Sequence, residues 1–258
     1  MTAYYNEINK HAAEWLRKLI ANGQIAPGDV DERSIEDVRA DDLVGYTQCH
    51  FFAGIGGWSL ALRLANWPDD REVWTGSCPC QPYSVAGRGL ADADPRNLWP
   101  QFRRLIAERR PPGVFGEQVA GKAGRSWFAG VRGDLEALGY AAGGADLCAA
   151  GVSAPHIRQR LYWVAHLDQT GWRDLAQGAT GSECDGLRAH GLGGWVGHWD
   201  REGKQTRFED GSTRRSKSGV GLLVDGFPGR MDEVGAYGNA IVPQVAQAFI
   251  ECVMECQP

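Results

Sequence analysis

Cys80 stands where a protein would present a nucleophile. It lies in the segment Ser77-Cys78-Pro79-Cys80-Gln81-Pro82-Tyr83-Ser84, one residue after the short apolar run Val73-Trp74-Thr75. The thiolate is the nucleophilic form of cysteine, and neighbouring cations favour it over the thiol. A single cysteine is more often a buried structural residue, so any chemistry also requires acids and cations elsewhere in the chain.

Four further segments carry side chains suited to such chemistry: the glycine-rich turn Phe51-Phe52-Ala53-Gly54-Ile55-Gly56-Gly57-Trp58, then Phe115-Gly116-Glu117-Gln118-Val119, then Arg158-Gln159-Arg160-Leu161-Tyr162, and Gly238-Asn239-Ala240-Ile241-Val242-Pro243. Glycines at a helix N-terminus let the backbone approach a nucleotide-like ligand closely. A carboxyl group such as Glu117 can transfer a proton. Taken singly, each segment has a plain structural explanation: a connecting turn, a surface carboxylate or an exposed strand face.

In this order, the five motifs resemble those of the cytosine-C5 DNA methyltransferases. The resemblance implies S-adenosyl-L-methionine (AdoMet) as methyl donor and double-stranded DNA as partner, with the target cytosine flipped out of the helix. Cys80 would add to C6 of the base, so that C5 can attack the methyl group. By resemblance Glu117 contacts N3 of the base, and Arg158 and Arg160 hold the base and the flanking phosphate.

The resemblance also implies binding residues. Those expected at the cofactor lie in the glycine turn, beside Cys80 and before the last helix: Phe52, Ala53, Gly54, Ile55, Gly56, Gly57, Trp58, Pro79, Asn239 and Ala240. Those expected at DNA lie next to Cys80 and in a basic stretch: Gln81, Ser84, Arg201, Lys204, Arg207, Arg214, Arg215 and Lys217. No metal or membrane is expected as a partner, and no protein partner is assigned.

Apolar patterning predicts the elements that hold these motifs. Helices are expected over residues 4–22, 58–64, 94–107, 126–138 and 241–254, and strands over 47–52, 72–75, 114–119, 140–148 and 161–166. Alternating strands and helices predict an α/β fold with a mostly parallel sheet covered on both faces. The resemblance makes this a Rossmann-like AdoMet-dependent methyltransferase fold with a reduced sheet. Ligands of such sheets collect at the carboxyl ends of the strands, where the motifs fall.

We divide the chain into four regions: an N-terminal helical and acidic extension (1–46), a catalytic domain (47–166), a small irregular target-recognition region (167–225) and a C-terminal segment that returns to the catalytic domain (226–258). Charge differs between the ends. Residues 29–42 carry seven acids and two bases, whereas residues 201–217 carry six bases and three acids. The net charge of −5 is mildly unfavourable for a nucleic-acid binder, so the basic stretch is the expected DNA contact, with a solvated loop as the alternative.

Three features depart from the family pattern. Gln118 stands where the family usually has asparagine, and the target-recognition region is short. Cys80 also follows Gly54 by only 26 residues (80 − 54), which omits two strand units whose acids hold the ribose hydroxyls and the adenine amine in the family. Either Asp69, Asp70 or the acidic segment 29–42 substitutes, or the cofactor is modified. We expect weakened or altered AdoMet binding, and an N-terminal segment that replaces part of the missing sheet edge.

Bulk properties are compatible with this hypothesis. Seven cysteines without repeated Cys-x-x-Cys pairs argue against a disulfide framework and a four-cysteine zinc site. With no apolar run of 18 residues and no signal-peptide pattern, we expect a soluble protein of the bacterial cytoplasm. By resemblance, such short chains are typical of phage and prophage genomes, where protection of viral DNA requires no paired restriction nuclease.

Two alternatives stay open at this point. One is a related C5-pyrimidine-modifying enzyme with another one-carbon donor or an RNA substrate. The other is a catalytically silent DNA-binding paralogue, against which the retention of Cys80, Glu117 and Arg160 together argues. A zinc-dependent nucleobase deaminase is disfavoured, because the chain has neither the His-x-Glu nor the Pro-Cys-x-x-Cys spacing.

Overall fold

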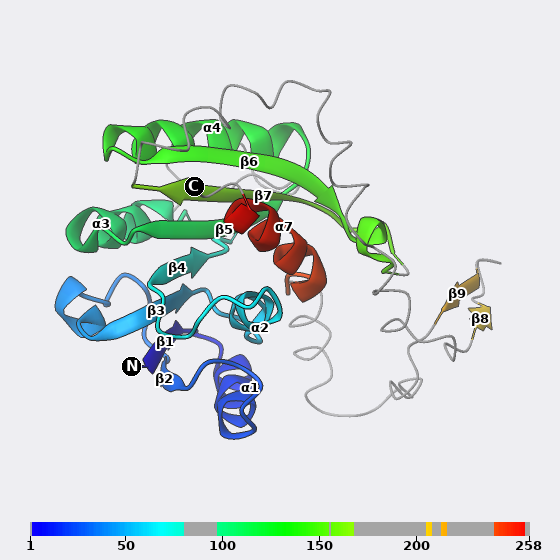
Figure 1. Cartoon of the computed structure of the whole chain (residues 1–258), viewed down its shortest axis with the longest axis horizontal. Helices are drawn as coiled ribbons and strands as arrows, with labels where there is room; N and C mark the ends of the chain where they lie inside the picture. The colour runs from blue at the N-terminus through cyan, green and yellow to red at the C-terminus, as the bar shows by residue number, and fades with distance from the viewer. Residues whose placement is uncertain are drawn as a thin grey trace.

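The computed structural model describes residues 2–79, 97–154, 156–167, 205–207, 213–215 and 240–255. Its main sheet has seven strands: β1 (Thr2–Asn6), β2 (Gly28–Asp31), β3 (Tyr46–Phe51), β4 (Val73–Gly76), β5 (Gly113–Val119), β6 (Ala141–Cys148) and β7 (Gln159–His166). The helices are α1 (Lys10–Ala21), α2 (Gly57–Leu64), α3 (Trp99–Arg109), α4 (Lys122–Ala137) and α7 (Pro243–Glu255), with 3-10 turns η1 (Ala40–Leu43) and η4 (Ala149–Val152). Figure 1 shows these elements along the chain.

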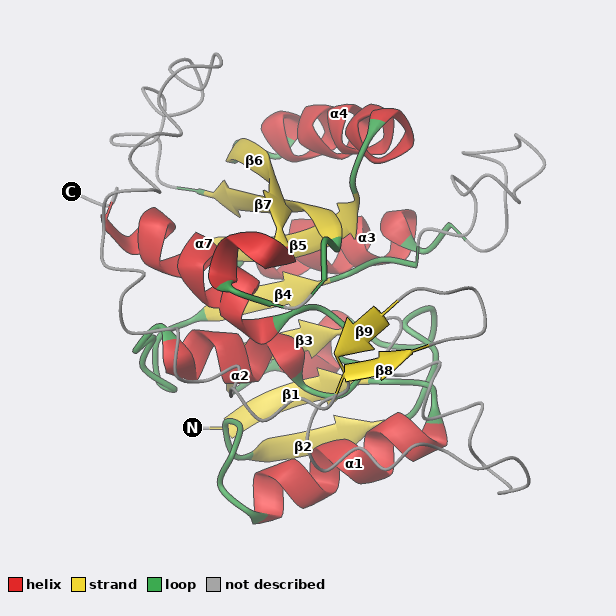
Figure 2. Cartoon of the chain, turned by 90° about the vertical axis from the view of Figure 1, so that its right-hand side faces the viewer, coloured by secondary structure: helices red, strands yellow, loops and turns green. Residues whose placement is uncertain are grey.

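The strands lie in the order β2-β1-β3-β4-β5-β7-β6, which Figure 2 shows side by side. Neighbouring strands from β2 to β5 pair in parallel, whereas β7 is antiparallel to both β5 and β6. The expected mostly parallel sheet is therefore confirmed. Because β7 is reversed, its first residues lie at the same edge of the sheet as the carboxyl ends of β1, β3, β4 and β5.

Both faces of the sheet are covered, as predicted. Along each strand the side chains alternate between the two faces, which explains why neighbouring residues enter different cores. In β7, Trp163 packs with side chains of α3 and α4, whereas Tyr162 packs with those of α2 and α7. Helix α1 lies on the same face as α2, where Leu16 meets Tyr5 and Leu60.

The N-terminal segment differs from its prediction. A helix was expected from residue 4, but residues 2–6 form β1, and α1 begins only at Lys10, with the Asn9 side chain accepting the Ala12 N–H at 3.1 Å. Tyr4 and Tyr5 are buried on opposite faces of the sheet, a period-2 pattern that favours a strand. The predicted helix end is confirmed at Asn22. As expected, this segment forms the sheet edge beside β3.

Two other expectations need correction. Helix α3 begins at Trp99 rather than at residue 94, which lies outside the described residues. The irregular region 167–225, for which no strand was expected, contains a short antiparallel ribbon of β8 (Gln205–Arg207) and β9 (Thr213–Arg215). Among the described residues, no helix is long and apolar enough to cross a membrane.

Candidate active site

The glycine turn follows β3 and begins α2. Phe52, Gly54 and Gly56 have φ angles of 52°, 54° and 82°, a left-handed conformation that costs glycine little and other residues more. A Cβ on Gly54 would meet no atom within 4 Å, so the backbone there is open to a ligand. A Cβ on Gly57 would lie 2.7 Å from Cγ1 of Ile241. The turn therefore packs against the C-terminal segment on one side and is accessible on the other.

The residues of this turn divide into an accessible and a buried set. Phe52, Ala53, Gly54 and Ile55 are half-buried, and the Phe52 ring meets Phe102 edge-on, with 6.3 Å between centroids. Gly56, Gly57 and Trp58 are buried. The accessible set is the part that a cofactor could touch. Ala240, from the other end of the chain, is also half-buried, while Asn239 lies outside the described residues.

Trp58 contributes to the cysteine loop rather than to an open surface. Its ring packs in the core against Phe115 and Tyr162, and its Nε1 donates a hydrogen bond to Ser77 Oγ at 3.0 Å. From β5, Gln118 Nε2 donates to the Cys78 carbonyl at 3.4 Å. The chain that leaves β4 is thus held from two neighbouring elements, at the carboxyl edge of the sheet.

Of the two cysteines in this loop, Cys78 is buried, and its burial raises the pKa of the thiol, which disfavours the nucleophilic form. Cys78 is therefore suited to packing rather than to reaction. Pro79 is exposed. Cys80 follows it immediately in the sequence and lies outside the described residues, as do Gln81 and Ser84.

Glu117 is the best-defined chemical group at this edge. It is 8 % exposed and sits near the end of β5, opposite Tyr162 of β7. Arg160 is opposite Val119, which makes it a diagonal neighbour of Glu117 on the same face. The two charges form an ion pair, with Arg160 Nε 2.7 Å from Glu117 Oε1.

The environment of Glu117 changes its proton affinity. Burial raises the pKa of the carboxyl to about 7, although Arg160 and Arg158 favour the ionised form and oppose the shift. Near neutral pH the group therefore exists in both protonation states. A carboxyl of this kind can donate a proton to a bound base and take it back.

Arg158 and Arg160 enter the site at the start of β7. Both are half-buried, and Arg160 Nη1 also donates to the carbonyl of Gln159 at 2.8 Å. Burial and the neighbouring Arg160 lower the pKa of Arg158 from its usual value. Two guanidinium groups beside one carboxyl leave a positive local potential, which suits an anionic ligand and a thiolate.

The remaining predicted DNA contacts are only partly described. Arg207, Arg214 and Arg215 lie on the β8–β9 ribbon, in which Arg214 pairs with Thr206 and Arg215 with Gln205. Arg201, Lys204 and Lys217 lie outside the described residues.

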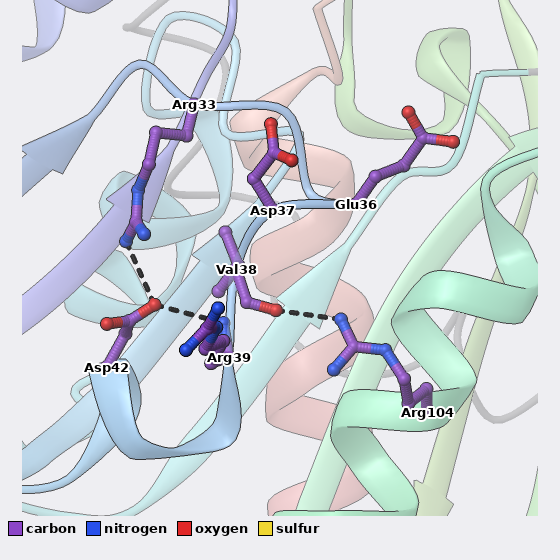
Figure 3. Close-up of a pocket in the computed structure, with 7 residues that line it drawn as sticks. All are labelled: Arg33, Glu36, Asp37, Val38, Arg39, Asp42 and Arg104. Carbon is purple, nitrogen blue, oxygen red and sulfur yellow. Dashed lines mark hydrogen bonds and ion pairs between the residues drawn. The ribbon is translucent and has the colours of Figure 1, made fainter.

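A separate cavity of about 570 Å³ lies between α3 and the segment that follows β2 (Figure 3). All of its lining residues except Arg104 belong to the acidic segment 29–42, which was one expected substitute at the cofactor; the lining residues are Arg33, Glu36, Asp37, Val38, Arg39, Asp42 and Arg104. Arg33 pairs with Asp31 and Asp42, and Arg104 donates to the Val38 carbonyl at 2.7 Å. The Arg104 hydrogen bond attaches the segment to α3, and we assign the cavity no part in the chemistry.

One residue at the carboxyl edge was not predicted. Glu7 directly follows β1, and its Oε2 accepts the N–H of Gly54 at 2.7 Å, across 47 positions of sequence. The signal in the sequence was an acid directly after the apolar residues of β1. It was missed because these residues were assigned to a helix.

Asp69, one of the expected substitutes at the cofactor, lies at the wrong edge of the sheet. It pairs with Arg63, and its carbonyl accepts from Thr47 near the start of β3. Asp70 is its neighbour in the loop that leads into the amino end of β4. The Asp69–Asp70 loop is therefore far along the strands from the carboxyl edge, and that part of the expectation is wrong.

Comparison with known proteins shows which family this chain is similar to. Residues 65–185 match the model of the C-5 cytosine-specific DNA methylase family. The match contains the cysteine loop, Glu117, Arg158 and Arg160. Over this range the chain is similar to the C-5 cytosine-specific DNA methylase family.

Individual relatives align with a smaller part of this chain than the family model does. Over 115 residues it is 34% identical to the type II methyltransferase M.AplI of Arthrospira platensis, an alignment that covers 44% of this chain and 32% of that relative. Over 108 residues it is 31% identical to the type II methyltransferase M.HgiCII of Herpetosiphon aurantiacus, an alignment that covers 27% of this chain and 25% of that relative. The chain thus spans about a third or a quarter of the length of these relatives.

Among solved structures, the Entamoeba histolytica methyltransferase EhMeth is similar to this chain with a TM-score of 0.44 and 17% identity, over 64% of this chain and 44% of that one. A DNA modification methyltransferase encoded within an Escherichia coli prophage gives a TM-score of 0.42 and 20% identity, over 64% and 39%.

Proposed function

We propose that this chain is a DNA cytosine-C5 methyltransferase, which transfers a methyl group from AdoMet to C5 of a flipped cytosine. The observation that carries the proposal is the buried Glu117–Arg160 pair at the carboxyl edge, with the chain to Cys80 leaving the adjacent strand β4. The pKa of about 7 at Glu117 gives this pair the proton chemistry that the reaction requires.

In the proposed mechanism the Cys80 thiolate attacks C6 of the cytosine and forms a carbon–sulfur bond. Protonated Glu117 donates its proton to N3, which withdraws electrons from the ring and makes C6 more electrophilic. C5 then carries the electron pair that would bond to the methyl group as the bond between that methyl group and the donor's sulfonium sulfur breaks, leaving the donor as a neutral thioether. Loss of the C5 proton to a base, elimination of the Cys80 sulfur and return of the N3 proton to Glu117 restore the aromatic ring, the free thiolate and the protonated acid.

AdoMet, when bound, supplies the electrophilic methyl group. The accessible part of the glycine turn fits a nucleoside-containing molecule, because the open space at Gly54 lets the backbone come close to it. Phe52 offers an aromatic face at the same place, and Pro79 and Ala240 border it in this proposal. The position of these residues at the carboxyl edge agrees with where ligands of parallel sheets lie.

The direct test is bisulfite sequencing of DNA from cells that express the chain. We expect protected cytosines within one recurring sequence, and none in cells that express Cys80→Ser. Cytosines that remain fully convertible in the presence of the wild-type protein would contradict the proposal for DNA. Methylated cytosine found in RNA alone would favour an RNA substrate instead.

The basic ribbon provides a prediction for DNA affinity. Replacing both Arg214 and Arg215 by glutamine should weaken DNA binding about equally across sequences, because interactions with phosphate carry no base information. The slope of log K against log salt should flatten by about one unit for each phosphate that the protein no longer neutralises. Fluorescence anisotropy at several salt concentrations measures both quantities.

The control replaces two arginines that lie outside the ribbon. Arg132→Gln with Arg109→Gln removes the same charge from helices α4 and α3. This control should leave the salt slope closer to the wild-type value. An unchanged slope in the Arg214/Arg215 variant would mean that the ribbon does not touch DNA.

A further inference from the structure

The ends of three neighbouring strands are joined by hydrogen bonds at the carboxyl edge. The N–H of Glu7, after β1, donates to the Asp31 carbonyl at the end of β2 at 3.0 Å. The N–H of Ala53, after β3, donates to the Asn6 carbonyl at the end of β1 at 3.0 Å. The loop after β1 is therefore fixed between the glycine turn on one side and β2 on the other.

Glu7 presents its carboxylate in a fixed orientation at this place. Oε2 accepts the Gly54 N–H at 2.7 Å, and Oε1 accepts the Asn9 N–H at 2.9 Å. A carboxylate has about four acceptor positions, so two of them are left for a ligand. The residue is only half-buried, which leaves the carboxylate within reach of a molecule lying on the glycine turn.

The other acid at these strand ends is already engaged. Asp31 Oδ2 accepts the Tyr4 hydroxyl at 2.6 Å, and both oxygens of Asp31 accept from the Arg33 side chain. The Arg33 backbone N–H adds a further hydrogen bond to Oδ1 at 2.9 Å. Of these two carboxylates, Glu7 is the one with acceptor capacity to spare.

Nucleoside ligands of open parallel sheets lie across the carboxyl edge. A glycine turn after one strand approaches the ligand backbone, and an acid at the end of the neighbouring strand accepts hydrogen bonds from the ribose hydroxyls. That neighbouring strand usually follows the glycine turn in the sequence. Here the strand beside β3 on that side is β1, which precedes the turn, while the next strand in sequence, β4, lies on the other side.

We propose that Glu7 is the ribose-binding carboxylate of the methyl-donor site, and that the unit β1–α1–β2 fills the place of strands expected between Gly54 and Cys80. This inference rests on the proposed function and assigns one subsite of it. The short spacing between Gly54 and Cys80 then results from a different order of the strands along the chain, in which β1 and β2 precede the glycine turn. AdoMet binding should then depend on the N-terminal segment through Glu7, which directly follows β1.

Calorimetry with two probes tests the assignment: S-adenosylhomocysteine, and its analogue without the 2′- and 3′-hydroxyls. Glu7→Gln should weaken the first by about ten- to a hundredfold, because a charge-assisted hydrogen bond is removed. It should leave the second within about twofold, because the analogue has no hydroxyl to donate. Glu14→Gln, an exposed acid on α1, is the matched control and should change neither.

The wild-type protein alone provides a readout that does not depend on the variant folding: it should bind S-adenosylhomocysteine at least about tenfold more tightly than the analogue. Equal affinity for the two probes would overturn the assignment while leaving the methyltransferase proposal in place. So would a Glu7→Gln variant that weakens both probes equally, since Glu7 would then act only by supporting the turn at Gly54. Binding of neither probe by the wild-type chain, with cytosine DNA present, would instead count against AdoMet as the donor and overturn both proposals.

Discussion

Cys80→Ser is expected to abolish both methyl transfer and the covalent complex with DNA that contains 5-fluorocytosine. Fluorine at C5 cannot leave as a proton does, so the enzyme remains bonded to C6 of the base after methyl transfer. A serine hydroxyl is far less ionised than a thiol near neutral pH and cannot replace the thiolate as nucleophile. Denaturing gel electrophoresis of labelled DNA measures the complex, and incorporation of labelled methyl groups into DNA measures turnover.

Cys78→Ser is the matched control, because it makes the same exchange two residues earlier in the same loop. Cys78 is buried, and its raised pKa disfavours the thiolate, so this variant should keep the covalent complex. A modest loss of stability is expected from a hydroxyl at a buried position. A denaturation-resistant complex that persists in Cys80→Ser would show that another group attacks the base.

The central strands were predictable because each one is an apolar run bounded by clear turn signals. β3, β4 and β5 are close to their predicted limits, and all three are buried between the two helical layers. The glycine turn, Glu117 and Arg160 were predicted as a group because their motifs, taken in order, resemble those of one family. The turn follows β3 and Glu117 lies near the end of β5, so the parallel order of these strands brings them to one edge. Arg160 reaches the same edge because it lies near the start of β7, which is antiparallel to β5.

The N-terminal edge was not predictable in the same way. β1 has only five residues, and the apolar residues of α1 extend the helical pattern back across it. What makes residues 2–6 a strand is pairing with β2 and β3, which lie 22 and 40 residues further along the chain. Such long-range pairing leaves little trace in local periodicity.

The hydrogen bond between Glu7 and Gly54 depends on that same pairing. No spacing rule connects an acid at residue 7 with a glycine turn at residue 54, because the usual order of strands places the acid after the turn. The proton affinity of Glu117 was also beyond sequence analysis. It results from burial beside Tyr162 and from the diagonal position of Arg160, which are properties of the β5–β7 register.

Glu117→Gln is expected to lower turnover by on the order of 10²-fold or more, with DNA affinity changed much less. Glutamine has nearly the same shape as glutamic acid and can still donate a hydrogen bond to N3 of the cytosine. It cannot transfer a proton, so the loss should appear in the step that adds the thiolate to C6. Single-turnover methyl transfer measures that step, and anisotropy with the same DNA measures affinity.

The pH profile separates proton transfer from a purely structural role. Because burial raises the pKa of Glu117 to about 7, the carboxyl holds its proton below that pH and loses it above. The contribution of Glu117 as an acid should therefore be complete near pH 6 and decline as the pH rises through 7. Ionisation of the Cys80 thiol has the opposite effect, because the fraction of nucleophilic thiolate increases with pH. Glu117→Gln should remove the decline on the alkaline side and retain the rise that belongs to the thiol. A variant that keeps the alkaline decline would show that the group titrating near pH 7 is not Glu117, and an unchanged single-turnover rate would exclude Glu117 as the proton donor.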